Sequence, residues 1–331
     1  MGYIELNQIA YVTHIPDDGR DVLLSTYYDQ ERKQWISYTT HQRKILELPV
    51  SNLVEGLYIA EAPADKDSDV RTELAEFVLQ YFAVPSLTNI DDQMAQDLVN
   101  QLASVHKYFV ILHHMNTYDD GTEIGLMTSE IEYAFANHRS FYDLLNRAVK
   151  EVIRHTTRRA NELPDSFRRV AQQESKALVE KFGLPAPLID FYKGKERIFM
   201  MLRSIRDNIL HHGKTPDYVY HFEDGFGLSI DRHLLADLKP LGLWPDELLK
   251  QNRIGSLLAV LNFLARDIFD TTNVLARQLK QCFEKLPPAV AEGYHAYLRS
   301  RLTPHLIRSD EYAARHWFRP EEVLELKVKQ R

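Results

Sequence analysis

The chain has 331 residues, 44% of them hydrophobic and 26% charged, and this ordinary globular usage argues against global disorder. Its 40 lysines and arginines against 47 aspartates and glutamates give a formal charge of −7, which argues against a general nucleic-acid coat protein. Cys282 is the single cysteine, so an internal disulfide and a cysteine-based zinc site are excluded.

The composition and the N-terminus together indicate a reducing, cytoplasmic compartment. The first residues, Met1–Leu6, lack the basic and apolar segments of a signal peptide. No stretch approaches the ~18 apolar residues of a membrane span. We therefore expect a cytoplasmic protein with no membrane segment.

Residues 1–65 predict a small β-rich N-terminal domain. The strand-like segments, rich in β-branched and aromatic residues, are 22–28, 34–40, 45–48 and 57–60. The first two flank a polar turn, which is typical of a hairpin. Residues 61–69 are the best linker candidate in the chain.

Residues 66–331 predict a mostly α domain, because apolar residues recur at three- and four-residue spacing. The expected helices are 70–82, 91–118, 123–159, 165–182, 188–212, 232–241, 246–286 and 288–302. Segments 218–222 and 226–230 flank Glu-Asp-Gly, which predicts a β-hairpin inserted between two of the helices. Gly255 indicates either a close helix contact or a simple loss of ~1 kcal/mol in helix propensity.

The segment Arg206–Gly213 concentrates an arginine, a carboxylate, a carboxamide and two histidines at the end of an apolar helix. An arginine fork suits phosphate, and histidine exchanges protons near neutral pH. Asp207 lies four residues before His211, so its carboxylate can orient that imidazole. On this interpretation Arg206 holds a phosphate, either His211 or His212 moves protons, and Asp207 or Asn208 orients the imidazole.

The same residues also have a purely structural interpretation. Arg203 and Asp207 are four residues apart and would form an ordinary helix ion pair. His211 and His212 would be favourable cations beside a helix C-terminus, and Gly213 would end the helix. The local pattern alone leaves both interpretations open.

Arg206-Asp207-x-x-x-His211 resembles the Arg-polar-x-x-x-His motif of HEPN domains, a superfamily of helical bundles that includes many metal-independent RNases. In that family the motif ends one long helix and a further bundle helix follows, a place that residues 246–286 would take here. The resemblance implies Arg206 and His211 as the catalytic pair and Asp207 as the auxiliary residue, where Asn is commoner. His212 is the alternative imidazole. A homodimer in which two motifs face one cleft is also implied.

The function that this resemblance implies is metal-independent endoribonucleolytic cleavage, in which a 2′-hydroxyl attacks the adjacent phosphate. HEPN proteins often act in phage defence or toxin–antitoxin systems, so an antitoxin or regulatory partner is a further expectation. The alternative is a non-catalytic HEPN-like module that binds nucleotide, RNA or protein. The acidic net charge and the Asp207 variation favour that alternative.

A basic stripe on the expected helix 123–159 offers a track for an RNA backbone, although a solvated helix face explains it as well. The RNA-binding candidates are Arg147, Lys150, Arg154, Arg158 and Arg203.

We expect neither a metal nor a cofactor. His113 and His114 are adjacent on a helix and point about 100° apart, so they would not share one ion. Walker motifs and nucleophile elbows are also missing from the sequence, which disfavours ATP-driven and serine-hydrolase chemistry.

Overall fold

The structure is a computed structural model that is mostly helical and carries a small three-stranded antiparallel sheet. It describes residues 3–4, 23–29, 31–32, 34–41, 44–50, 56–60, 73–74, 77, 86–118, 123–156, 163–212, 219–231, 236–251, 253–282, 295–299 and 302–323. Within these ranges, none of the helices combines the length and the apolar character that crossing a membrane requires.

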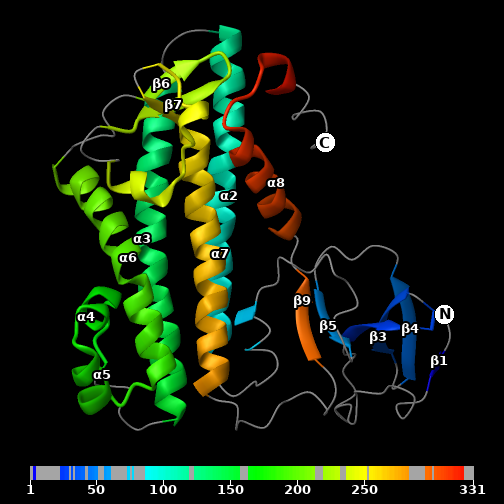
Figure 1. The fold of residues 1–331 in the computed structure, drawn as a ribbon. Coiled ribbons are helices and arrows are strands. Elements are labelled where there is room, and N and C mark those ends of the chain that lie inside the picture. Colours follow the sequence, from blue (N-terminus) through cyan, green and yellow to red (C-terminus); the bar gives the residue numbers. More distant parts are fainter. Residues whose placement is uncertain are drawn as a thin grey trace.

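Four long helices run up and down along one axis and form a bundle (Figure 1). They are α2 Ser86–Tyr118, α3 Glu123–Thr156, α6 Ala186–His212 and α7 Leu257–Cys282. Helices α2 and α6 each pack against α3 and α7, so they occupy opposite corners. The apolar spacing therefore predicted the bundle helices, with α2 beginning five residues earlier than expected, at Ser86.

Aromatic side chains fill the core between α3 and α6. The Tyr142 ring centroid lies 5.2 Å from that of Phe199 and 5.0 Å from that of Phe167. Phe167 begins the short helix α4 Phe167–Ala171, which α5 Ser175–Phe182 follows. The expected single helix 165–182 is therefore wrong, because the chain turns between α4 and α5 to bring Phe167 into the bundle.

A small sheet lies at the end of the bundle where α7 begins (Figure 1). Its antiparallel strands are β6 Val219–Phe222, β7 Gly225–Ser229 and β8 Ile254–Ser256. The β6–β7 hairpin was predicted, whereas β8 was not. The expected helix 246–286 includes the 3₁₀ turn η5 Asp246–Leu248 and β8, and regular helix starts only at Leu257. Likewise, the expected helix 232–241 is described as the 3₁₀ helix η4 Ala236–Leu241.

Close contact with Trp244 explains Gly255. A Cβ atom at this position in β8 would lie 2.6 Å from the Trp244 ring, so the backbone and the indole approach each other too closely for any side chain. Next to it, the Ser256 hydroxyl accepts the backbone N–H of Leu258 at 3.2 Å and caps the start of α7. The close contact is therefore between a strand and a ring, not between two helices.

A second sheet combines strands from both ends of the chain. Its strands are β1 Tyr3–Ile4, β2 Leu23–Asp29, β3 Gln34–His41, β4 Lys44–Val50, β5 Gly56–Ala60 and β9 His295–Arg299, in the order β1-β4-β3-β2-β5-β9. The predicted β2–β3 hairpin is present. The expected helix 288–302 is wrong for residues 295–299, because antiparallel pairing with β5 overrides their helical pattern.

Helix α8 Leu302–Arg315 follows β9 and lies against α2 and α7. Of the expected helix 70–82, residues 73, 74 and 77 are described and are helical. The backbone N–H of Glu73 donates to Asn273 of α7 at 2.9 Å, which ties this segment to the bundle. The linker candidate 61–69 lies outside the described residues.

Candidate functional site

Two arginines surround one aspartate near the end of α6. Arg203 Nε donates to Asp207 Oδ2 at 3.1 Å, and Arg206 Nη1 donates to Asp207 Oδ1 at 2.9 Å. The Arg203–Asp207 pair spans one helical turn, as the spacing predicted. The cluster contains two guanidinium groups and one carboxylate, so it keeps an excess positive charge.

The electrostatics of this cluster favour a further acceptor oxygen. Burial alone would raise the pKa of Asp207, but hydrogen bonds and charges from Arg206 and Arg203 hold that pKa below its usual value. The Arg206 side chain is 26% exposed, and its buried Nε has no hydrogen-bond partner among the described residues. A buried donor without an acceptor is costly, and a phosphate oxygen would satisfy it.

The histidines of the motif belong to the same helix. Helix α6 continues to His212, so the backbone carries the whole motif without a break. Residue 211 is four positions after Asp207 and therefore falls on the stripe that Arg203 and Asp207 share. The side chains of His211 and His212 lie outside the described residues.

The predicted basic stripe on α3 is largely engaged by neighbouring side chains. Lys150 pairs with Asp165, and Arg154 Nη1 lies 3.0 Å from Glu151 Oε1. Arg147 Nη1 donates to Gln93 Oε1 of α2 at 3.4 Å. Arg158 lies outside the described residues.

The basic stripe on α3 is also far from the arginine cluster on α6, measured along the axis of the bundle. Tyr192 of α6 donates its hydroxyl to Asn146 of α3 at 2.8 Å, which fixes the relative height of the two helices. Arg206 is 14 residues beyond Tyr192, or about 21 Å at 1.5 Å per residue, whereas Arg147 is next to Asn146. The structure therefore does not bring the stripe and the cluster together.

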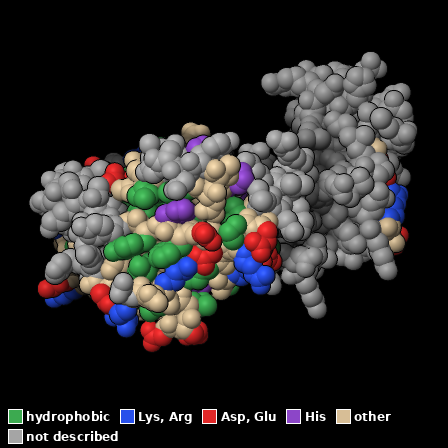
Figure 2. Space-filling model, turned by 90° about the horizontal axis from the view of Figure 1, so that it is seen from above, with side chains coloured by type: hydrophobic (Ala, Val, Ile, Leu, Met, Phe, Trp, Pro, Cys, Tyr) green, Lys and Arg blue, Asp and Glu red, His purple; other side chains and the backbone are tan. Residues whose placement is uncertain are grey.

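Charges are mixed on the end face of the bundle as well. In Figure 2, Lys and Arg side chains lie beside Asp and Glu around a group of hydrophobic side chains. Lys250, for example, pairs with Asp224 and lies over the rings of Phe222 and Trp317, 4.3 and 4.4 Å from their centroids. The described part of this face carries no continuous basic surface, so the arginine cluster on α6 stays the leading phosphate-binding candidate.

A buried carboxylate connects three bundle helices. Asp267 of α7 is 6% exposed, and it accepts hydrogen bonds from the Tyr142 hydroxyl of α3 at 2.8 Å and from Lys195 Nζ of α6 at 3.3 Å. Thr271, one turn later in α7, donates at 3.0 Å. His138 Nε2 of α3 lies 3.1 Å from Oδ2 but is out of line for a hydrogen bond.

These neighbours keep Asp267 ionised. Burial alone would raise its pKa, but the His138 imidazole, the Lys195 ammonium and the Tyr142 hydroxyl together hold that pKa well below the usual value. The pKa of Tyr142 is raised in turn, by burial and by the charge of Asp267. The network leaves no room for substrate, because His138 is fully buried, so its role is to hold α6 against α3 and α7.

Asp97 of α2 also interacts electrostatically with His138. Burial raises the pKa of Asp97 to about 6, although the charge of His138 acts in the opposite direction. Its Oδ2 atom is buried and has no hydrogen-bond partner among the described residues. Asp97 is therefore a carboxyl group that costs free energy when it ionises.

The sequence interpretation missed the Asp267 network, although a signal was available. Asp267 lies on the same apolar face of α7 as Leu264 and Ile268, and His138 and Tyr142 are spaced four apart on α3. A charged residue on a buried face requires a partner, which indicates such a network.

Comparison with models of protein families, with curated proteins and with solved structures gave no match. Within the described ranges, no group of three or more His, Cys, Asp or Glu side chains is arranged to hold a metal ion.

We predict that Asp267→Asn lowers the free energy of unfolding by about 3 kcal/mol, because the Lys195 ammonium loses the charge that compensates it. Urea unfolding followed by circular dichroism measures this. Asp270→Asn, three residues away with a side chain that is 51% exposed, is the matched control and should change stability by less than about 0.5 kcal/mol. Equal effects of the two substitutions would contradict the assigned role.

Asp97→Asn should raise the free energy of unfolding above that of the parent at pH 8, and the gain should be smaller at pH 5. The folded pKa of about 6 exceeds the ordinary 3.8, so the folded state holds the proton more tightly. That stabilisation is complete below pH 3.8 and is lost as the pH rises through 6. We expect a gain of about 1 kcal/mol at pH 8, discounted for partial exposure. If the difference in the free energy of unfolding between the parent and Asp97→Asn did not change with pH, the raised pKa of Asp97 would be ruled out.

Proposed function

We propose that the protein is a metal-independent endoribonuclease whose site is the end of α6. The observation that supports this most is the convergence of Arg203 and Arg206 on Asp207, one helical turn before His211. The cluster supplies positive charge and the buried Arg206 Nε, a donor that has no partner among the described residues, for a phosphodiester. The proposal that this bundle is HEPN-like depends on the motif and on its position in the third of the four long helices.

In the proposed reaction the two arginines bind the non-bridging phosphate oxygens and stabilise the charge that develops on them. The 2′-hydroxyl oxygen forms a bond to phosphorus, and the bond from phosphorus to the 5′-oxygen breaks. One imidazole removes the 2′-hydroxyl proton, and a second gives a proton to the leaving oxygen. His211 of each protomer in a homodimer would supply these two imidazoles, with His212 as the alternative.

The second candidate is a module that binds RNA, nucleotide or a protein partner without cleavage. The ion pair between Arg206 and Asp207 favours it, since a guanidinium already held by a carboxylate is less free to stabilise a transition state. A role in phage defence or with an antitoxin partner is compatible with either candidate and depends on the motif alone.

We expect the purified protein to cleave total RNA in excess EDTA. Arg206→Ala and His211→Ala should each slow cleavage by about 100-fold or more, the range for loss of a catalytic proton-transfer or charge-stabilising group. Lys176→Ala is the control, because this lysine on α5 is 79% exposed and remote from the cluster. Gel analysis of the RNA measures the rates, and fluorescence anisotropy of a labelled oligonucleotide measures binding.

The two measurements separate the candidates. If the parent protein binds RNA without cleaving it, and Arg206→Ala weakens that binding, the binding module is the better candidate than the ribonuclease. Cleavage that survives Arg206→Ala would contradict the assigned site. Absence of both binding and cleavage would contradict both candidates.

A further inference from the structure

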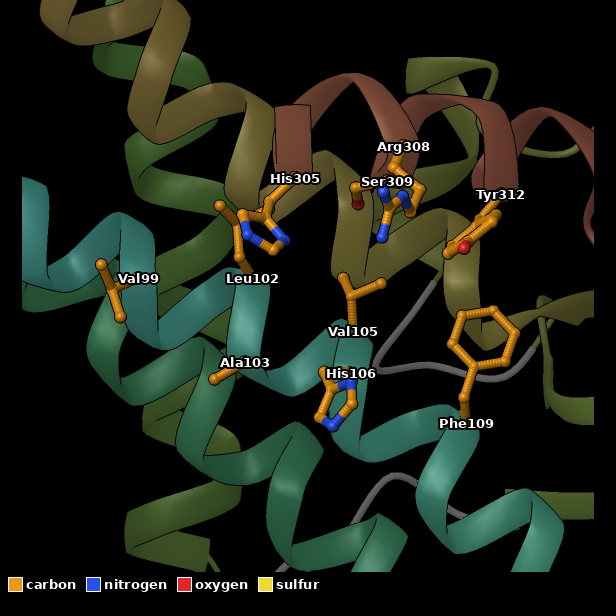
Figure 3. A pocket seen from close by; sticks show the side chains of 10 residues that line it. All are labelled: Val99, Leu102, Ala103, Val105, His106, Phe109, His305, Arg308, Ser309 and Tyr312. Carbon is orange, nitrogen blue, oxygen red and sulfur yellow. The ribbon is translucent and has the colours of Figure 1, made fainter. Parts of the chain in front are cut away.

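A pocket of about 460 Å³ lies between α2 and α8 (Figure 3). Its lining residues are Val99, Leu102, Ala103, Val105, His106 and Phe109 of α2 and His305, Arg308, Ser309 and Tyr312 of α8. A volume of this size falls within the range of ~300–1,000 Å³ typical of small-molecule sites. The arginine cluster belongs to α6, whereas α8 packs against α2 and α7, so the two sites are independent.

The lining is basic in an acidic protein. It contains an arginine and two histidines but no carboxylate, although the chain as a whole carries a formal charge of −7. Figure 3 shows the Arg308 side chain reaching from α8 toward α2, between His305 and Tyr312, with His106 on the facing helix. Among the described residues, Arg308 makes no hydrogen bond or ion pair, and its charge acts on the neighbouring Tyr312.

Helix α8 carries two acidic residues, Asp310 and Glu311, and within the described part of the chain neither forms an ion pair with Arg308. Asp310 accepts bonds from Asn262 at 3.0 Å and from Arg266 at 3.3 Å, on the α7 side. A guanidinium that lies over an apolar wall, with no counterion among the described residues, attracts an anion, and arginine binds phosphate or carboxylate oxygens in pairs. The polar part of the pocket therefore suits the anionic group of a ligand.

The opposite end of the pocket is aromatic. The rings of Phe109 and Tyr312 meet edge to face with centroids 4.9 Å apart, and each also contacts Phe318. Burial raises the pKa of Tyr312, so its hydroxyl is neutral and can donate a hydrogen bond. Tyr312 follows Arg308 by one helical turn, which separates the aromatic end from the cation by about 6 Å along α8.

We propose that this pocket binds a small organic anion with an aromatic body, of the nucleoside monophosphate type. The phosphate lies against Arg308 with His106 and His305 at its sides, and the planar ring lies against Phe109 and Tyr312. Val99, Leu102 and Val105 form the apolar wall. The proposal does not depend on RNA cleavage at α6.

Isothermal titration calorimetry of the full chain with adenosine monophosphate tests this. We expect one site per chain and binding weaker by at least about tenfold in Arg308→Gln, which removes the charge-assisted contact. Ala103→Phe should also abolish binding, because it fills the pocket without changing its charge. Lys176→Gln, which removes an equal charge from the exposed face of α5, should bind as the parent does.

Component ligands show which part of the pocket is used. Adenosine and inorganic phosphate should each bind more weakly than the nucleotide, and decanoate, an aliphatic anion, more weakly still. Circular dichroism confirms that each variant is folded; if Arg308→Gln is not, Ala103→Phe decides. Absence of nucleotide binding, unchanged binding by folded Arg308→Gln, or preference for decanoate would each overturn the proposal.

Discussion

The buried carboxylate of Asp267 is the constraint on which the arrangement of the bundle depends. A carboxylate in an apolar core is unfavourable unless positive charge and donors surround it, and here they come from α3, α6 and α7 itself. Lys195 of α6 and Tyr142 of α3 satisfy the two oxygens of the same side chain. This requirement fixes both the height and the rotation of α6 relative to its neighbours.

Because α6 is held in place, the arginine cluster near its C-terminal end is held in place as well. Arg203 lies two turns beyond Lys195, and Arg206 and Asp207 follow within the next turn, so the cluster is at a rigid position on the bundle. A site built on a packed helix holds its charges in place before a ligand arrives, and this lowers the cost of organising them. The pocket beside α8 is lined by α2 and has its own cation, Arg308, so the two proposed anion sites lie on different helices of one scaffold.

The parts of the fold that local patterns determine were predictable, and the parts that distant contacts determine were not. Apolar periodicity identified α2, α3, α6 and α7, and the carboxylate–glycine turn identified the β6–β7 hairpin. Residues 295–299 have a helical pattern, yet they become β9 because β5 offers a free edge. The Arg203–Asp207 pair followed from four-residue spacing. The apolar face of α7 indicates that Asp267 needs a partner, but not that the partner is Tyr142, 125 positions away. The Arg308 pocket likewise joins two helices from distant parts of the chain, which spacing along the chain does not reveal.

The chemical nature of the RNA fragment ends is the most direct test of the proposed RNA cleavage at the end of α6. Purified protein would be incubated with a synthetic RNA in excess EDTA, and the termini would be identified by mass spectrometry. Attack by the 2′-hydroxyl predicts a 2′,3′-cyclic phosphate on one fragment and a 5′-hydroxyl on the other. Fragments with 3′-hydroxyl and 5′-phosphate ends, or RNA that stays intact, would contradict the account.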